Sequence, residues 1–222
     1  MNLPKKRAAL YVDGFNLYHS INDLDKEYLK WCNLWRLGEN IIPKVTEELK
    51  IVTYCSAYHT KGDFGKLVRH QRYVKALETV GVNCVLGHFV KEDMDCRHCD
   101  GQWEKPTEKE TDINVALSLY DDALHDRFDH AYLLTADSDQ AATARMYRAK
   151  FQGAKKLTTV SPPGRNFSKD ILRYADGKIA LDENHIDLAA FSHLVSAAGK
   201  PSVLRPEEYI PPAGWVHPDQ RP

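Results

Sequence analysis

Short runs of mostly apolar residues alternate with longer stretches of mixed polarity along most of the chain. The apolar runs have the length and composition of buried strands; they lie at residues 8–12, 51–55, 82–89, 131–135 and 157–160. The longer stretches between them are helical candidates, at residues 63–80, 109–125, 139–151 and 168–175. This alternation predicts an α/β fold.

The stretch at 63–80 shows the helical spacing most directly. Apolar or aromatic side chains recur there at intervals of three and four residues and so share one helix face; they are Leu67, His70, Val74 and Leu77. Strands separated by helices are joined by right-handed crossovers, which lay the strands parallel and place helices on both faces of the sheet. We therefore expect a mostly parallel central sheet, covered on both sides by helices, in one domain at residues 1–182.

Beyond residue 176 the pattern weakens. A short apolar run at 178–181 precedes a helix-like stretch, which predicts a C-terminal helix at residues 183–200. Six of the 11 prolines lie in residues 201–222, and this density predicts an extended tail, because proline interrupts both helix and sheet. The tail is either a solvated terminus or a segment that docks on a protein partner or a second copy of the chain. Its apolar residues for such docking are Tyr209, Ile210, Trp215 and Val216.

The composition excludes several classes of protein. The chain has 222 residues, of which 43% are hydrophobic and 27% charged, so it can bury a core and is not a disordered chain. With 30 Lys and Arg against 31 Asp and Glu, its net charge of -1 does not suit a protein that coats nucleic acid by bulk charge. Five cysteines, an odd and scattered set, favour a reducing compartment over a disulfide framework. The N-terminus lacks the apolar segment of a signal peptide, and no apolar run approaches the ~20 residues that span a bilayer. We therefore expect a cytoplasmic protein that does not use the membrane.

Acidic residues follow two of the predicted strands at the point where each strand ends. Asp13 comes directly after the first strand, and Asp137 and Asp139 follow the strand at 131–135. The carboxyl ends of parallel strands lie at one edge of a sheet, where the functional groups of α/β proteins gather. The sequence thus predicts three carboxylates at one edge.

Asp112 is a fourth candidate for the same edge. Thr107 and Glu110 have the spacing of a capping box, which predicts that a helix begins there and that Asp112 lies early in it. Each acid taken alone has a simpler explanation as a turn or helix-cap residue. Taken together, clustered carboxylates repel one another, and a hard divalent cation such as Mg²⁺ relieves that repulsion. Such a cation can also activate water and neutralise charge on a phosphodiester.

Several motifs, taken in order along the chain, resemble one protein family. The principal ones are Asp13-Gly14-Phe15-Asn16, Glu108-Lys109-Glu110-Thr111-Asp112-Ile113-Asn114 and Ala136-Asp137-Ser138-Asp139. Further similarity runs through Tyr73-x3-Leu77, Gly87-His88-Phe89, Asp122-Ala123, Ser161-Pro162-Pro163 and Leu172-x-Tyr174-Ala175-Asp176. Together they cover about residues 7–180 and look like the NYN domain, in the LabA-like branch of the PIN-like nucleases.

This resemblance implies a Rossmann-like, three-layer α/β/α fold of the PIN type. It also implies a ribonuclease that depends on Mg²⁺ or Mn²⁺ and acts on single-stranded or structured RNA. Carried over residue by residue, it implies that Asp13, Asp112, Asp137 and Asp139 form the metal site. Asn16 is then expected to orient Asp13 or a water molecule on the metal.

Two positions depart from the pattern of that family. Ala136 stands where many relatives have glycine, and a tight turn accommodates alanine less easily. Gln140 follows the last acid, close to where an apolar residue or proline is common. Neither departure removes an acid, so they put the substrate in question rather than the activity.

The charges along the chain are segregated. Residues 92–139 contain 14 acidic and four basic residues, whereas residues 145–173 contain eight basic and one acidic residue, and residues 61–75 contain five and one. An acidic metal-binding edge between basic segments suits a nucleic-acid backbone. The candidates for phosphate contacts are Arg69, Arg72, Arg145, Arg148, Arg165 and Lys169, and each of them also fits a solvated helix face.

Aromatic residues and histidines near the same edge each have two roles open to them. Aromatic rings could stack on bases or pack in the core; they are Phe15, Tyr18, Tyr54 and Tyr58. Histidines could act as a general acid or base or be ordinary packed or surface side chains; they are His19, His59, His70 and His88. Nothing in the sequence chooses among them.

Cys96 and Cys99 have the spacing of a zinc knuckle, within a polar loop expected at residues 91–107. A structural zinc site needs four ligands, and the chain has no second Cys-x-x-Cys. Nearby histidine or cysteine residues, or a second subunit, would have to complete a Zn²⁺ site. The alternative is a pair of reduced thiols in a loop.

Two functions from different classes fit these observations. The first is a metal-dependent endoribonuclease that uses the four acids, and the second is a non-catalytic RNA-binding or scaffolding module that docks through its tail. Retention of all four acids counts against the second. A phosphatase of the aspartyl-phosphate type would need a second Asp two residues after Asp13, where Phe15 stands, and a P-loop nucleotidase would need a Gly-x4-Gly-Lys-Ser/Thr motif that the chain lacks.

Overall fold

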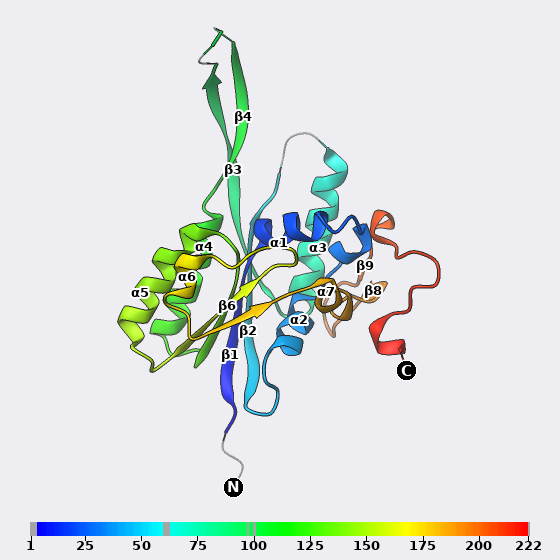
Figure 1. Cartoon of the computed structure of the whole chain (residues 1–222). Helices are drawn as coiled ribbons and strands as arrows, with labels where there is room; N and C mark the ends of the chain where they lie inside the picture. The colour runs from blue at the N-terminus through cyan, green and yellow to red at the C-terminus, as the bar shows by residue number, and fades with distance from the viewer. Residues whose placement is uncertain (1–3, 60–62, 97, 100, 222) are drawn as a thin grey trace.

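Seven strands form the central sheet in the described part of the chain, which the computed structural model shows in the order β4-β3-β2-β1-β5-β6-β7 (Figure 1). The structure describes residues 4–59, 63–96, 98–99 and 101–221. The strands are β1 (Lys6–Asp13), β2 (Glu47–Ala57), β3 (Asn83–Asp95), β4 (Gln102–Lys109), β5 (His130–Leu134), β6 (Lys156–Ser161) and β7 (Gly177–Ala180). Neighbouring strands are parallel except β3 and β4, which form an antiparallel hairpin at one edge.

Helices cover both faces of this sheet (Figure 1). The α-helices are α1 (Gly14–Asn22), α2 (Leu34–Ile41), α3 (Phe64–Thr79), α4 (Thr111–Leu124), α5 (Ala141–Phe151), α6 (Lys169–Leu172) and α7 (Glu183–Leu188). Short 3-10 helices are η1 (Glu27–Lys30), η2 (Ser138–Gln140), η3 (Glu207–Tyr209) and η4 (Pro218–Gln220), and strands β8 (Leu194–Val195) and β9 (Val203–Leu204) form a second, two-stranded sheet. Within the described residues, no helix combines the length and the apolar character needed to cross a membrane.

Strand β1 explains why the molecule has three layers. Its side chains alternate between the two faces of the sheet, and both sets are fully buried. Ala8, Leu10 and Val12 pack in a core with residues of α1, α2, α3 and α7, whereas Ala9 and Tyr11 pack in a second core with residues of α4, α5 and α6. The expected α/β class, with a mostly parallel sheet between two helical layers, is therefore confirmed.

The prediction of a polar loop at residues 91–107 is wrong. Strand β3 continues to Asp95 and β4 begins at Gln102, so the cysteine pair lies at the tip of a hairpin that projects beyond the body of the molecule (Figure 1). The side chains of β4 are exposed or only half-buried along its whole length. A strand that buries neither face shows no regular alternation of apolar residues, and its sequence therefore resembles a loop.

The prediction of a helix over residues 183–200 is wrong in its length, since α7 has only six residues. After α7 the backbone pairs with the segment that precedes α2: Asn33 donates to the carbonyl of Ala189 (2.7 Å), and Phe191 donates to the carbonyl of Trp31 (2.9 Å). Helices α1 and α2 were not predicted at all. They have nine and eight residues, too few for an apolar stripe to recur clearly.

The proline-rich segment packs against the body of the molecule as far as residue 221. Val203 and Tyr209 are buried in the first core, and the indole of Trp215 donates a hydrogen bond to Asp187 (2.7 Å). With these contacts the segment is not a freely solvated terminus. Its use as a docking segment for a partner stays a prediction, carried by the half-exposed side chain of Val216.

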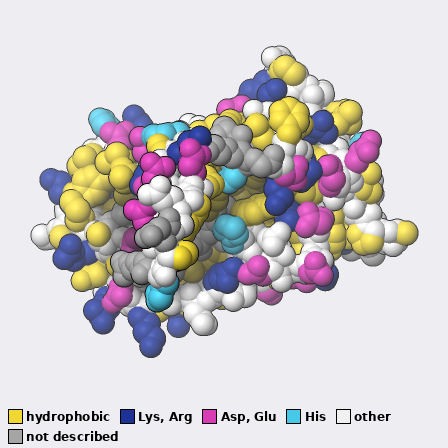
Figure 2. Space-filling model, turned by 90° about the horizontal axis from the view of Figure 1, so that it is seen from above, with side chains coloured by type: hydrophobic (Ala, Val, Ile, Leu, Met, Phe, Trp, Pro, Cys, Tyr) yellow, Lys and Arg dark blue, Asp and Glu magenta, His cyan; other side chains and the backbone are white. Residues whose placement is uncertain are grey.

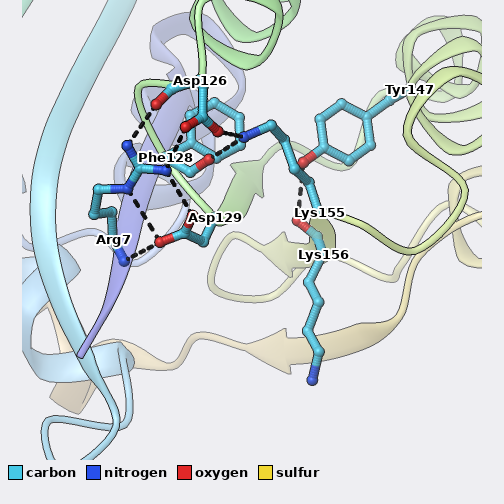
Figure 3. Close-up of polar contacts among 7 residues, drawn as sticks. All are labelled: Arg7, Asp126, Phe128, Asp129, Tyr147, Lys155 and Lys156. Atoms are coloured by element: carbon cyan, nitrogen blue, oxygen red, sulfur yellow. Dashed lines mark hydrogen bonds and ion pairs between the residues drawn. The ribbon is translucent and has the colours of Figure 1, made fainter. Parts of the chain in front are cut away.

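A network of charged groups joins the start of β1 to the loops before β5 and β6, at the amino ends of these strands (Figure 3). Arg7, on β1, forms ion pairs with Asp129 (2.7 Å) and Asp126 (3.1 Å) in the loop before β5. Lys155, just before β6, pairs with Asp126 and donates to the carbonyl of Phe128. Hydrogen bonds from Arg7 lower the pKa of Asp129 to about 2. The network holds β1, β5 and β6 in register at the end of the sheet away from the predicted acids.

Replacing Asp129 with Asn should lower the free energy of unfolding by about 1 kcal/mol at pH 7, because the ion pair is partly screened by solvent. The pair stabilises the fold above the pKa of an unfolded Asp, about 3.9, and loses its effect as the pH falls toward the folded pKa of about 2. Urea unfolding of Asp129→Asn and the parent should therefore differ less at pH 3 than at pH 7. Asp170→Asn, which breaks a more exposed pair with Arg173, is the control. An equal difference at both pH values would contradict the prediction.

Candidate functional site

A cavity of about 910 Å³ opens at the edge of the sheet where the parallel strands end. Its walls come from the ends of β1 and β2, from β3 and β4, from helices α1 and α3, from the start of α4 and from the turn after β5. Figure 2 shows the molecule from above, with histidine side chains in the middle of this face, bordered by hydrophobic surface and by both acidic and basic side chains. The cavity lies at the edge where the sequence predicted functional groups.

Asp13 is the last residue of β1 and the N-cap of α1. Its side chain is buried and accepts two hydrogen bonds, from the backbone N–H of Asn16 (3.0 Å) and from the hydroxyl of Thr135 (2.9 Å). Burial raises its pKa although both hydrogen bonds lower it, and the charges of Asp137 and Glu108 raise it further. Asp13 is thus a fixed carboxylate that is costly to ionise without a cation.

Gly14 allows the chain to turn sharply after Asp13. A Cβ atom at this position would lie 2.6 Å from the carbonyl oxygen of Cys55 and 2.7 Å from the ring of Tyr54. Those distances are far below van der Waals contact, so only glycine lets α1 begin against the end of β2.

The turn after β5 is tied to Asp13 by short polar contacts. The hydroxyl of Thr135 accepts from the backbone of Asp137 (3.0 Å) while it donates to Asp13, and the side-chain oxygen of Asn16 accepts from the backbone of Ala136 (3.0 Å). Asn16 therefore contacts Asp13 through its backbone and uses its side-chain oxygen to hold the turn. The sequence analysis did not single out Thr135, whose only signal was its position at the end of an apolar run.

Asp112 reaches the cavity from the first turn of α4, as predicted, but the capping box does not form. Thr107 lies in β4 and its hydroxyl donates to Glu92, and the N-cap residue Glu110 makes no side-chain cap. The start of α4 is instead held by Gln140, whose amide donates to the backbone carbonyl of Asp112 (2.9 Å). Gln140, which departs from the pattern of the family that the chain resembles, thus has a structural use.

The pKa of Asp112 is raised to about 6, first by burial and then by the charges of Asp13, Asp137, Glu108 and Asp139. Carboxylates from three separate segments of the chain therefore act on one another across the cavity. Sequence reasoning predicted this convergence for all of them except Glu108.

Glu108 lines the cavity but was not predicted as a site residue. It lies near the end of β4, lines the cavity and accepts a hydrogen bond from the backbone N–H of Thr111 (2.8 Å), the first residue of α4. It was missed because β4 was missed. Asp139, in contrast, is exposed and does not line the cavity, and its backbone N–H donates to the side chain of Asp137 (3.0 Å).

The carboxylates that line the cavity suit Mg²⁺ or Mn²⁺ rather than a soft metal. Among the described residues, no three His, Cys, Asp or Glu side chains are already drawn together as a metal-binding group. The acids suit a cation because they are buried and repel one another, and both effects raise the pKa values of Asp13 and Asp112. Binding would require them to move closer together.

Of the six candidates for phosphate contacts, Arg165 lines the cavity, where it pairs with Asp23. Arg69 pairs with Asp63 and Glu208. The cavity lining does not include Arg69, Arg72, Arg145, Arg148 or Lys169. Cations that the sequence analysis did not select do line it: Lys30, Lys66 and Lys105.

The histidines divide in the same way. His19, His59 and His70 line the cavity, whereas His88 does not and faces Glu110 (3.3 Å). Burial lowers the pKa of His70 to about 4, so this imidazole is neutral at pH 7 and cannot act as a general acid there.

Cys96 and Cys99 are free thiols at the tip of the β3–β4 hairpin. Hydrogen bonds from the backbone of His98 and from Cys99 lower the pKa of the Cys96 thiol, which favours the thiolate form that binds metals. Among the described residues, no three His, Cys, Asp or Glu side chains at this tip form a group that could hold a metal. A zinc site there stays a prediction that needs ligands from elsewhere.

Comparisons with known proteins give a distant relative and a similar fold. No protein-family model matches the chain. It is 25% identical over 242 residues to the 6-hydroxy-3-succinoylpyridine 3-monooxygenase HspA of Pseudomonas putida, an alignment that covers 91% of this chain and 75% of that protein. A crystal structure of a protein of unknown function from Vibrio parahaemolyticus matches with a TM-score of 0.51 and 18% identity, covering 81% of this chain and 95% of the other. The second likeness shows a shared fold.

Replacing Asp137 with Asn should lower the pKa of Asp112 from about 6, because one of the negative charges that raise it is removed. Carbon-detected NMR titration of the Asp112 carboxyl group, without divalent cations, measures the change. Asp139→Asn should lower that pKa less, because its charge contributes less. An unchanged pKa in Asp137→Asn would mean that the two carboxylates do not share one site.

Proposed function

We propose that this chain is a metal-dependent ribonuclease, similar to the NYN domains of the PIN-like nucleases, that hydrolyses RNA phosphodiester bonds at the acidic cavity. The observation that carries the proposal is the convergence of Asp13, Asp112 and Asp137 on one cavity. They come from the end of β1, the start of α4 and the turn after β5. Such an arrangement is costly unless a cation is bound, and its cost is the best indication that one is.

In this proposal Asp13, Asp112 and Asp137 hold Mg²⁺ or Mn²⁺. When bound, such a cation activates water and neutralises charge on the phosphate. The task of the chain itself is to hold the carboxylates in place. Thr135 and Asn16 do so, because they fix the carboxylate of Asp13 and the turn after β5 with the same set of hydrogen bonds.

Two further acids have different parts. Glu108 lines the cavity and its charge acts on both Asp13 and Asp112, so it belongs with the groups that face the cation. Asp139 stays outside the lining, so it acts through its charge and through its backbone N–H, which donates to the side chain of Asp137.

Basic side chains around the cavity supply attraction for the RNA backbone. Arg165, Lys30, Lys66 and Lys105 line it together with the acids. Phosphates are therefore drawn to the cavity by cations on its walls while the carboxylates exclude them until a metal is bound. This makes RNA binding depend on both salt and divalent cations.

Asp13→Asn and Asp137→Asn should each lower the rate of RNA cleavage by at least about 100-fold, since each removes a charge that holds the cation. The assay follows fluorescently labelled RNA pools with Mn²⁺ and with Mg²⁺, and far-UV circular dichroism shows that the variants are folded. Asp121→Asn, on the same helix as Asp112 but outside the cavity lining, is the matched control and should cut like the parent.

Two results would remove the proposal: a parent protein that cleaves no RNA in the pools with either cation, or acid variants that cut as fast as the parent. RNA binding that depends on salt but survives loss of the acids, without any cleavage, would instead identify a non-catalytic RNA-binding module.

The similarity to HspA favours a second candidate, the oxidation of a hydroxylated pyridine ring in the same cavity. The aromatic lining of the cavity suits such a ring, but the chain has no Gly-x-Gly-x-x-Gly motif for a flavin or nicotinamide dinucleotide. Oxygen uptake with 6-hydroxy-3-succinoylpyridine, NADH and added flavin tests it. Uptake that requires both the protein and the pyridine supports this candidate, and uptake no faster than without protein removes it.

A further inference from the structure

One part of the cavity lining is largely aromatic and is called here the aromatic wall. Rings from β2 and the residues after it, from β3, and from helices α1 and α3 line it: Phe15, Tyr54, His59, His70, Tyr73 and Phe89. A volume of about 910 Å³ lies in the range of sites that bind small organic molecules. The metal chemistry proposed above uses none of these rings, so the aromatic wall needs its own explanation.

The rings hold one another in place in two groups. Phe89 packs edge to face against Phe15, with ring centres 5.9 Å apart, and against His59, at 4.7 Å. Tyr54 packs edge to face against Tyr73, at 5.9 Å. Rings that are already fixed lose little freedom when a ligand binds, which favours binding of another flat ring.

Two polar groups of the aromatic wall bond to each other. The hydroxyl of Tyr54 and the Nε2 atom of His70 lie 3.2 Å apart and share a hydrogen bond, and burial keeps the imidazole uncharged at pH 7. The hydroxyl of Ser56, which is buried, also lines the cavity. Neutral donors and acceptors beside aromatic rings suit an uncharged heterocycle rather than an ion.

The aromatic wall adjoins the acids along the chain. The ring of Tyr54 lies so close to Gly14 that a Cβ atom there would be 2.7 Å from it, and Gly14 follows Asp13 in the chain. A ligand that fills the cavity would therefore have a flat ring at one end and a group facing the carboxylates at the other. A nucleotide has this shape, with its base as the ring and its phosphate as the group that a cation on the carboxylates would bind.

We propose that the aromatic part of the cavity is a base-binding subsite, which takes one unpaired base of an RNA strand while the adjoining phosphate lies at the carboxylates. This inference rests on the proposed function. A base within a duplex is stacked and paired, so only a base in a single strand, loop or bulge enters the subsite. The subsite thus selects where the strand is cut without reading a long sequence.

The test measures RNA binding rather than cleavage, and its background is the parent chain with Ca²⁺ in place of Mg²⁺ or Mn²⁺, a hard cation that carboxylates bind. Fluorescence anisotropy follows a labelled ten-nucleotide RNA, the same RNA in a duplex, and versions with one abasic nucleotide at each position. The single strand should bind at least about ten-fold more tightly than the duplex. One abasic position should weaken binding by about five-fold or more, the value of one stacked base.

Phe89→Ala and His59→Ala should each weaken binding of the single strand by about five-fold or more and remove the sensitivity to the abasic position. His59 is an exposed side chain, so its variant is expected to fold even if Phe89→Ala does not. Trp103→Ala is the matched control, because Trp103 is half exposed on β4 and does not line the cavity; it should bind like the background protein.

Equal binding of duplex and single strand, an abasic series without a sensitive position, or full binding by both His59→Ala and Phe89→Ala would overturn the subsite. Its failure is distinguishable from failure of the proposed function. Position-dependent binding by a protein that never cleaves RNA leaves the subsite standing without the nuclease. If the parent cleaves RNA but no abasic position weakens binding, the proposed nuclease is retained and the subsite is rejected.

Discussion

The buried carboxylate of Asp13 is the constraint on which the rest of the site depends. It ends the central strand β1, caps α1 through the backbone of Asn16, and accepts a hydrogen bond from Thr135 at the end of β5. The same two partners hold the turn that carries Asp137. One carboxylate thus fixes the ends of two neighbouring strands, and Gly14 lets the chain leave the sheet against Tyr54. The acids and the aromatic wall lie next to each other here because Gly14, which follows Asp13, lies against Tyr54.

The acids at this end of the sheet repel one another, and the repulsion raises their pKa values. Burial alone would raise the pKa of Asp13, and the neighbouring carboxylates add to the effect at Asp112. A folded chain keeps such a cluster only if something offsets its cost, and a hard divalent cation does so directly. Two of the basic side chains on the cavity wall are paired with other acids, Arg165 with Asp23 and Lys30 with Glu27.

The sequence predicted the parts of the fold that bury apolar residues. The strands around Leu10 and Leu133 stand out because both faces of the sheet are covered, and acids at the ends of such strands are easy to place at one edge. Strand β4 buries neither face and gave no such signal, so Glu108 was missed as a site residue. Only Arg165 of the six basic candidates lines the cavity, because charge along the chain does not tell which face of a helix points to a site. The end of α7 could not be predicted either, since it is decided by backbone pairing with a segment about 160 residues earlier in the chain, at Trp31 and Phe191.

The most direct test of this account is a crystal structure of the chain soaked in Mn²⁺, with the ion located by its anomalous scattering. The account predicts an anomalous peak in the cavity, coordinated by Asp13 together with Asp112 or Asp137, and a contraction of these carboxylates around it relative to the metal-free protein. A cavity without a peak at millimolar Mn²⁺, or a peak confined to Cys96 and Cys99 at the hairpin tip, would contradict it.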